Sequence, residues 1–228
     1  LKGIRQEADR LVIGAMTTQH ELLASPEVSA AFPILKETAL LIADPQVRYR
    51  GTLGGNVVNG DPGNDMPALM MTLGASYRLE GPDGARDVAA SDFYQGAYFT
   101  ALEPGELLTA ITIPFAASGH GYAYEKLKRK VGDYATAAAA VMLTMANGKV
   151  ESCSIGLTNL SDTPLLAEAA AEAVIGTGLD DDTLKKASER AQEIMSPAAD
   201  ARGPVEYRKH VGGIMVMRAL KRAAARAA

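Results

Sequence analysis

Residues 48–65 are rich in glycine and carry residue types that suit the binding of an anionic group. Five of these eighteen residues are glycine, and Gly54 and Gly55 are adjacent, with Thr52 and Asn56 on either side. Because glycine has no Cβ, such a pair lets the backbone approach a ligand, and its N–H groups can form a nest for phosphate. The stretch lacks the Gly-Lys-Ser/Thr of a P-loop and the spacing of a Rossmann G-x-G-x-x-G motif. It favours a nucleotide pyrophosphate held by another fold, and a glycine-rich surface turn without a ligand is the alternative.

A second distinctive stretch, residues 122–141, concentrates positive charge. Lys126, Lys128, Arg129 and Lys130 fall within five residues. On a strand, the three lysines would point to one face and Arg129 to the other. Such charge runs are usually a solvated strand face or an edge protected by lysines. The alternative is a cationic rim that faces a cofactor or an acidic partner, and the residues alone leave both open.

Composition and charge exclude several classes of protein. The chain has 228 residues, 47% of them hydrophobic, which is enough for a packed core and for two modest domains. Its net charge of −4 argues against a nucleic-acid partner, and no apolar run approaches the roughly 20 residues of a membrane span. One cysteine, Cys153, allows neither a disulfide framework nor a Cys-ligated iron–sulfur cluster. The three histidines lie far apart, so no metal site is expected. These features indicate a soluble protein of a reducing, cytoplasmic compartment.

Local patterns predict a mixture of strands and helices. A threonine followed by an acidic residue within 17–21 is typical of a helix start. Asp65 is expected to cap a buried helix whose methionines pack in the core. Asn147-Gly148 is the strongest short signal of a hairpin. The predicted strands cover residues 11–16, 76–80, 85–88, 107–114, 122–130, 137–146 and 149–158. The predicted helices cover residues 33–42, 65–75, 163–175, 183–195 and 204–228.

These elements predict two α+β domains. The small and glycine-rich residues 116–121 favour a boundary, so that the first domain covers residues 1–117 and the second covers residues 118–228. In the second domain, strands are followed by helices. We expect a small three-stranded antiparallel sheet that is covered on one face by helices.

The glycine-rich stretch also resembles a known flavin site. Thr52-Leu-Gly-Gly-Asn56, followed by Asp61-Pro-x-x-Asp65 and an apolar helix, resembles the flavin loop of the medium subunits of molybdenum hydroxylases. That family includes xanthine dehydrogenases and aerobic carbon monoxide dehydrogenases. The resemblance covers the whole chain, and several stretches are most similar to carbon monoxide dehydrogenase medium subunits: 61–69, 96–100, 122–141 and 156–159.

The resemblance implies a fold. Residues 1–117 would be part of an FAD-binding domain of the vanillyl-alcohol-oxidase-like (PCMH) type, and residues 118–228 the C-terminal domain of the flavoprotein subunit. In the family, a first small lobe carries a further glycine-rich segment of the Ala-Gly-Gly-x-Ser/Asp type. No such segment precedes Gly54. We therefore expect the natural chain to begin upstream, with that lobe.

The resemblance also implies flavin contacts. In the family, the loop matched by residues 52–56 holds the pyrophosphate, and the acidic residue matched by Asp65 touches the nucleotide beyond that loop. Apolar contacts match Ile42 and Leu108, for which plain core packing fits the sequence equally well. Lys126 matches a lysine beside the flavin, and Tyr134 matches an aromatic position near the isoalloxazine ring. The full set of expected cofactor-binding residues is Ile42, Thr52, Leu53, Gly54, Gly55, Asn56, Asp65, Leu108, Lys126 and Tyr134.

The function implied by the resemblance is electron transfer. Electrons from a molybdenum cofactor of the molybdopterin type on a large subunit would pass through [2Fe–2S] clusters on a small subunit to FAD on this chain. FAD would pass them to a quinone or another acceptor, which would bring the enzyme against the inner face of the membrane. The implied assembly is a dimer of heterotrimers, and the implied reaction is the oxidation of carbon monoxide with water to carbon dioxide.

Two alternatives stay open from the sequence. The same role could serve a xanthine, nicotine or aldehyde dehydrogenase, because the substrate is chosen on the large subunit. A flavin-free docking subunit is the third interpretation. Within the leading interpretation, we expect Lys126 and Tyr134 to close the site over the isoalloxazine ring. A cation near the flavin raises its potential, so loss of Lys126 would lower it.

Overall fold

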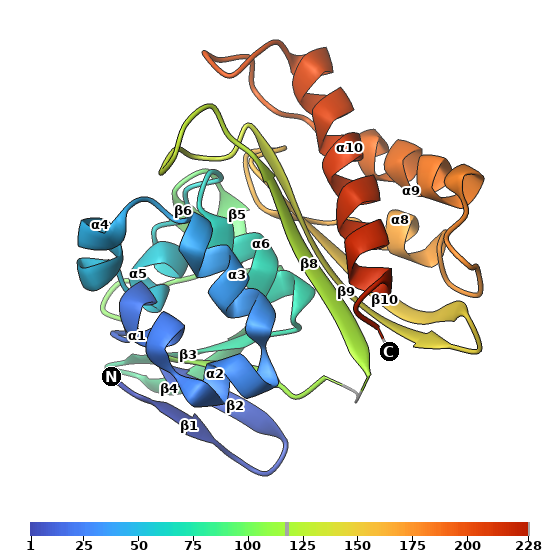
Figure 1. Ribbon diagram of the computed structural model, residues 1–228. Coiled ribbons are helices and arrows are strands. Elements are labelled where there is room, and N and C mark those ends of the chain that lie inside the picture. Colours follow the sequence, from blue (N-terminus) through green and yellow to red (C-terminus); the bar gives the residue numbers. More distant parts are fainter. Residues whose placement is uncertain (117–118, 228) are drawn as a thin grey trace.

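The computed structural model of this protein describes residues 1–116 and 119–227 (Figure 1). In these residues, two large antiparallel sheets, a small two-stranded one and the helices packed around them form the structure, which confirms the predicted α+β class. The predicted boundary between residues 117 and 118 lies outside the described residues. None of the described helices is both long and apolar enough to cross a membrane.

The first sheet has five strands, all antiparallel to their neighbours. The predicted hairpin around residues 76–88 and the predicted strand over 107–114 are both confirmed. In spatial order the strands are β1 (Ile4–Gln6), β2 (Arg10–Gly14), β7 (Leu107–Pro114), β3 (Ser76–Gly81) and β4 (Gly84–Ala89).

Six helices lie between β2 and β3 in the chain. Thr18 caps the first with a capping box, in which Thr18 and Glu21 each accept from the other's backbone N–H. Asp44 caps the fourth, so Asp44-Pro45 starts a new helix as well as ending the previous one. The helices are α1 (Gln19–Ala24), α2 (Pro26–Ala31), α3 (Pro33–Leu41), α4 (Pro45–Arg50), α5 (Leu53–Val58) and α6 (Asp65–Thr72). Between β4 and β7, the chain forms the short helix α7 (Ala90–Phe93) and the strands β5 (Tyr94–Gly96) and β6 (Phe99–Thr100).

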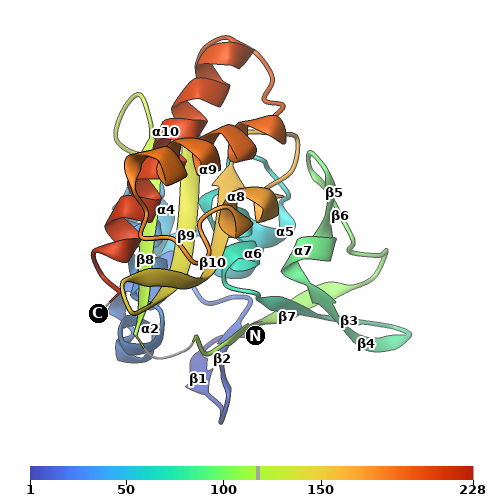
Figure 2. The ribbon, with the colours of Figure 1, turned by 90° about the vertical axis from the view of Figure 1, so that its right-hand side faces the viewer.

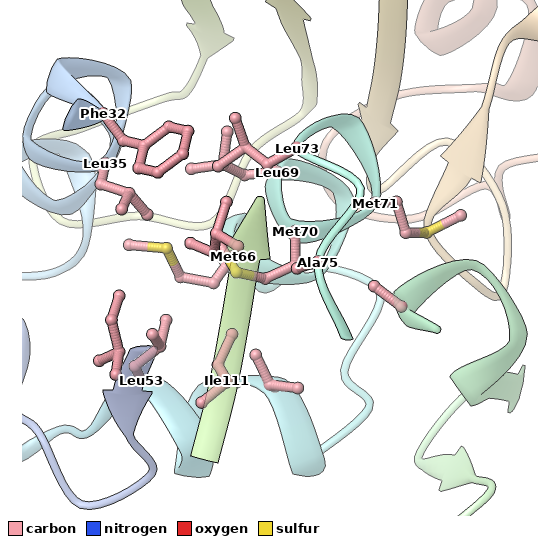
Figure 3. Packing of buried hydrophobic residues seen from close by; sticks show 14 of the residues in the cluster. Phe32, Leu35, Leu53, Met66, Leu69, Met70, Met71, Leu73, Ala75 and Ile111 are labelled. Atoms are coloured by element: carbon pink, nitrogen blue, oxygen red, sulfur yellow. The ribbon is translucent and has the colours of Figure 1, made fainter. Parts of the chain in front are cut away.

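Helix α6 is buried on every side. Met66 and Met70 are completely buried, which confirms their predicted role in the core. Figure 3 shows side chains of this helix packed near Phe32, Leu35 and Ile111. The helix therefore fixes its own N-terminal residue, Asp65, deep inside the molecule.

The second sheet has four strands. The Asn147-Gly148 hairpin is confirmed, since Lys149 pairs with Ala146 and the two strands continue antiparallel from there. The prediction of three strands is wrong. Two residues of the segment 163–175, which was predicted to be helical, form a fourth strand along the outer edge of the hairpin. In spatial order the strands are β11 (Leu165–Leu166), β10 (Lys149–Thr158), β9 (Ala137–Ala146) and β8 (His120–Leu127).

Helices cover both faces of the second sheet, as Figures 1 and 2 show. On one face lie α8 (Glu168–Glu172), α9 (Asp181–Glu193) and α10 (Val205–Ala224), and on the other lie α3 and α6. The prediction of one covered face is therefore wrong. The alanines of β9 explain the difference: Ala138 and Ala140 belong to the core around α6, whereas Ala137 and Ala139 belong to the core around α10. Small side chains on both faces let helices approach from both sides.

Ion pairs also join helix α3, on one face of the second sheet, to helix α10 on the other. Glu37 of α3 pairs with Arg222 and Arg226 of α10, at 2.6 and 2.9 Å. The same carboxylate accepts a hydrogen bond from the backbone N–H of Tyr124 on β8, at 2.8 Å. This hydrogen bond fixes the position of β8 relative to α3.

We expect Gly156→Ala to lower the free energy of unfolding by about 1–3 kcal/mol, the usual cost of overpacking a core. A Cβ at this position of β10 would lie 2.5 Å from the carbonyl oxygen of Ala68 on α6. Urea unfolding measures the change. Gly96→Ala is the matched control, since its Cβ would lie 3.8 Å from that of Phe99; equal effects of the two substitutions would contradict the close approach of α6 to the sheet.

Candidate functional site

Two adjoining pockets lie where α5, α6 and the end of β8 meet. Pocket A has a volume of about 300 Å³ and pocket B about 420 Å³. They share four lining residues, Ile42, Val47, Asn56 and Asn64, so they form one continuous depression. Pocket A is completed by Ala43, Asp65, Lys126, Gly132, Asp133 and Tyr134. Pocket B is completed by Gln19, Arg50, Gly51, Thr52, Gly55 and Asn59.

The pockets bring together seven of the ten residues expected from the sequence: Ile42, Thr52, Gly55, Asn56, Asp65, Lys126 and Tyr134. The other three line neither pocket. Leu53 is completely buried in the core, and Gly54 lies on the buried side of α5. Leu108 lies on β7 opposite Leu79, with 8% of its surface exposed.

The two adjacent glycines have different roles. The N–H of Gly54 donates to the carbonyl of Ala15 at 2.9 Å, and that of Gly55 donates to Oγ1 of Thr52 at 2.9 Å. The predicted nest of free N–H groups is therefore wrong for this conformation, because both donors are used inside the protein. A Cβ on Gly54 would lie 2.7 Å from the carbonyl oxygen of Ala15. Gly54 thus allows α5 to pack against the chain after β2, while Gly55 is exposed at the wall of pocket B.

Asp65 does not cap α6 as predicted. The N-cap residue is Asn64, and the Asp65 carboxylate turns instead toward β8. It accepts from Nζ of Lys126 at 2.6 Å and from the hydroxyl of Tyr124 at 2.7 Å. Burial raises the pKa of the Asp65 carboxyl, and the Lys126 ammonium opposes that rise. The tertiary partners win because a buried carboxylate needs a countercharge more than a helix end needs a cap.

The three lysines of the basic run do not share the strand face that was predicted for them. Strand β8 ends at Leu127, so the alternation predicted for residues 126–130 stops there. Lys126 is an enclosed partner of Asp65, with 1% of its side chain exposed. Arg129 pairs with Asp133 at 3.0 Å, and burial together with the nearby Lys126 charge lowers the pKa of Lys128. Because Lys126 forms an ion pair with Asp65 that is neutral overall, we expect loss of Lys126 to lower a flavin potential by less than loss of an unpaired lysine would.

Tyr134 offers an aromatic surface at pocket A. Its side chain is 46% exposed, and the Cζ of Arg202 lies 5.9 Å from the centre of its ring. The ring lies against Gly63, where an added Cβ would be 2.8 Å from Cδ1 of Tyr134. Burial and then the Asp61 charge raise the pKa of the hydroxyl, so the side chain is neutral near pH 7.

A buried arginine holds the segment that carries Tyr134. Arg208 on α10 is 2% exposed, and its guanidinium donates to the carbonyls of Thr136, Asn159 and Ala198. Asn159 in turn donates from Nδ2 to the carbonyl of Ala135 at 2.6 Å. These bonds fix the chain between β8 and β9 and so set where Tyr134 lies.

Sequence reasoning missed several residues of the pockets. Gln19 and Val47 line them and lie outside both the glycine-rich stretch 48–65 and the basic run, whereas Asn64 lies within that stretch but was not among the expected site residues. Gln19 is 2% exposed, and neither atom of its amide has a hydrogen-bond partner among residues 1–116 and 119–227. A glutamine in the first turn of a helix gives no signal in the sequence that its side chain is buried. Asn64 had a signal, since it directly precedes Asp65 in the predicted helix cap.

The pocket chemistry suits a large polar ligand with an aromatic part. Pocket A combines the apolar Ile42 and the ring of Tyr134 with a neutral ion pair. Pocket B carries four amides and a hydroxyl beside the apolar Ile42 and Val47, with Arg50 as a positive charge. Together they fall in the range of small-molecule and cofactor sites.

Comparison with known proteins identifies the family of both parts of the chain. Residues 1–116 match the family described as the FAD binding domain in molybdopterin dehydrogenase, and residues 122–223 match the CO dehydrogenase flavoprotein C-terminal domain. The carbon monoxide dehydrogenase medium chain of Afipia carboxidovorans is 64% identical over 100% of this chain and 79% of its own length. That of Hydrogenophaga pseudoflava is 46% identical over the same shares. The solved structure of reconstituted CO dehydrogenase from Oligotropha carboxidovorans superposes with a TM-score of 0.98 at 65% identity, over 100% of this chain and 79% of that chain.

Proposed function

Since this chain belongs to the FAD-binding medium subunits of molybdenum hydroxylases, we propose that it holds FAD along pockets A and B as the flavoprotein subunit of an aerobic carbon monoxide dehydrogenase. The observation that carries the FAD site is the convergence of seven expected residues on one depression. The observation that carries the carbon monoxide reaction is the 64% identity to a carbon monoxide dehydrogenase medium chain over the whole of this chain.

The residues of the depression fit this cofactor. The half-exposed Tyr134 ring can stack against an isoalloxazine ring in pocket A. Thr52 and Arg50 offer a hydroxyl and a positive charge to a pyrophosphate in pocket B, and Gly55 leaves the wall there without a side chain. The Asp65–Lys126 pair adds polar groups at the wall of pocket A without adding net charge. FAD, once bound, accepts electrons and passes them on in one- or two-electron steps.

The protein's own contribution is to orient the cofactor and to limit its contact with water. Tyr134 and Ile42 enclose pocket A with apolar surface, while the hydrogen bonds of Arg208 keep the Tyr134 segment in place. Leu53, Gly54 and Leu108 act indirectly in this proposal, because they support the wall from the core. The same arrangement supports the proposed division into domains, in which residues 1–117 would supply pocket B and residues 118–228 would close pocket A.

The partners follow from the family. The curated relatives are named medium chains, so this chain is one subunit of a larger enzyme. We propose that a large subunit carries the molybdenum cofactor and a small subunit the [2Fe–2S] clusters, in a dimer of heterotrimers. A quinone or another acceptor would take the electrons from FAD, which would place the enzyme at the inner face of the membrane.

We expect the enzyme purified with its natural partner subunits to show a flavin absorption spectrum that carbon monoxide bleaches when no acceptor is present. Xanthine, nicotine and aldehydes should leave the spectrum unchanged, because the large subunit would select carbon monoxide. Anaerobic spectrophotometry with each compound measures this directly. An assembled enzyme without flavin would support a docking subunit, and bleaching by another compound would reassign the substrate.

A further inference from the structure

The buried amide of Gln19 is a polar group without a hydrogen-bond partner in the part of the chain that the structure describes. The residue begins α1, and its backbone N–H donates to the carbonyl of Gly51 at 2.9 Å. Its side-chain Nε2 and Oε1 are both enclosed, and neither has a hydrogen-bond partner in the described ranges 1–116 and 119–227. Buried donors and acceptors are rarely left unsatisfied, because each one has lost its water. A group other than the described residues is needed to complete this amide.

Two other buried polar atoms without a partner are less informative. Thr38 lies in α3 and lines neither pocket, and Nε of Arg202 belongs to a guanidinium whose NH1 and NH2 already pair with carboxylates. Gln19 differs from both, because it lines pocket B and both of its polar atoms lack a hydrogen-bond partner among the described residues. It is therefore the residue of this set that points to a ligand.

The chemistry of an amide limits what that ligand presents. Nε2 donates and Oε1 accepts, side by side. Phosphate oxygens near pH 7 mainly accept, so a phosphate would satisfy Nε2 and leave Oε1 facing negative charge. A hydroxyl both donates and accepts, and two neighbouring hydroxyls satisfy both atoms of the amide. The other amides of pocket B, Asn56, Asn59 and Asn64, belong to the same neutral chemistry.

We infer that Gln19 binds hydroxyl groups of a sugar or sugar-alcohol portion of the nucleotide held in pocket B. This inference rests on the proposed function, in which the ligand is FAD. FAD carries such hydroxyls in two places, on the ribityl chain next to the isoalloxazine ring and on the ribose of its adenosine. FMN carries only the ribityl chain, so the two sources can be separated.

The test is Gln19→Met in the assembled enzyme, which removes the amide and keeps the length of the side chain. After removal of flavin, titration with FAD should give a Kd at least about tenfold higher than that of the wild type, which corresponds to about 1.4 kcal/mol. The flavin-free variant should unfold at the same temperature as the flavin-free wild type or higher, because it no longer buries an unsatisfied amide. A purely structural glutamine would give the opposite change in stability.

Titration with FMN identifies the sugar. Equal losses of affinity for FAD and FMN assign Gln19 to the ribityl chain, and a loss for FAD alone assigns it to the ribose. Gln192→Met is the matched control: Gln192 donates to Ser188 within α9, so this variant should keep its affinity for flavin.

Two results would overturn the inference. An unchanged Kd in Gln19→Met would remove Gln19 from the site, and a lower unfolding temperature of the flavin-free variant would show that the amide has partners inside the protein. Gly55→Val separates this failure from failure of the proposed function. If Gly55→Val loses flavin while Gln19→Met keeps it, only the role of Gln19 is wrong.

Discussion

Replacing Lys126 with methionine is expected to lower the free energy of unfolding by about 3–5 kcal/mol, the usual cost of breaking a buried ion pair by removing one partner. Nζ of Lys126 lies 2.6 Å from Oδ2 of Asp65, and the two side chains are 1% and 5% exposed. Methionine fills similar space, so the loss reflects the charge left on Asp65 and only to a small extent packing. Urea unfolding of the variant and the wild type measures the difference.

The loss in this variant should depend on pH. Burial raises the pKa of Asp65, and Lys126 is the largest influence that opposes the rise. In the variant, the Asp65 carboxyl therefore binds its proton more tightly in the folded protein than in the unfolded chain. The variant is then most stable below the pKa of Asp65 in the unfolded chain, about 3.9, and its free energy of unfolding falls as the pH rises toward the higher pKa of Asp65 in the folded protein. The deficit relative to the wild type should grow from about pH 4 upward.

The double variant Lys126→Met/Asp65→Asn is the control for this prediction. It removes both charges, and the new amide oxygen would still accept a hydrogen bond from Tyr124, so most of the lost stability should return. A deficit below about 1 kcal/mol in Lys126→Met, or no recovery in the double variant, would contradict a buried, mutually dependent pair.

Replacing Gly55 with valine is expected to abolish flavin retention through purification while the rest of the chain stays folded. A side chain at this exposed position would project from the wall of pocket B beside Thr52. Its Cβ would lie 2.9 Å from Oγ1 of Thr52, a hydroxyl that can shift at the cost of about 1 kcal/mol for the helix cap. The flavin-to-protein ratio and the circular dichroism of the purified complex measure the two effects.

Gly54→Val is the matched contrast, one residue away. Its Cβ would lie 2.7 Å from both the carbonyl oxygen and the Cβ of Ala15, and the main chain there cannot move without displacing α5. This variant should lose both flavin and stability. Normal flavin content in Gly55→Val would count against pocket B, and a well-folded Gly54→Val would count against the packing of α5.

The sequence predicted best what is decided locally. Asn147-Gly148 requires a tight hairpin, because both residues adopt positive φ, and the strands on either side were therefore predicted with the observed bounds. The strand β7, which ends at Pro114 as predicted, and the helix start at Thr18 are equally local. Each of these signals lies within a few residues of the element that it specifies.

The errors concern contacts between distant segments. Asp65 looks like a helix cap in sequence, but its partners Lys126 and Tyr124 are about 60 residues away. The basic run was predicted to be one strand, but the strand ends at Leu127. The run Ala137 to Ala140 indicates from the sequence a strand of small residues. It does not indicate that helices cover both faces of that strand, which depends on distant segments. The seven residues of the site were predicted through resemblance to a family, and Gln19 was outside the reach of both arguments.

An electron-density map of the assembled enzyme with flavin bound tests the central claim most directly. We expect the isoalloxazine ring in pocket A against Tyr134, and the pyrophosphate in pocket B beside Thr52 and Gly55. Flavin density away from these pockets, or a ring in pocket A whose pyrophosphate leaves Thr52 and Gly55 untouched, would contradict it.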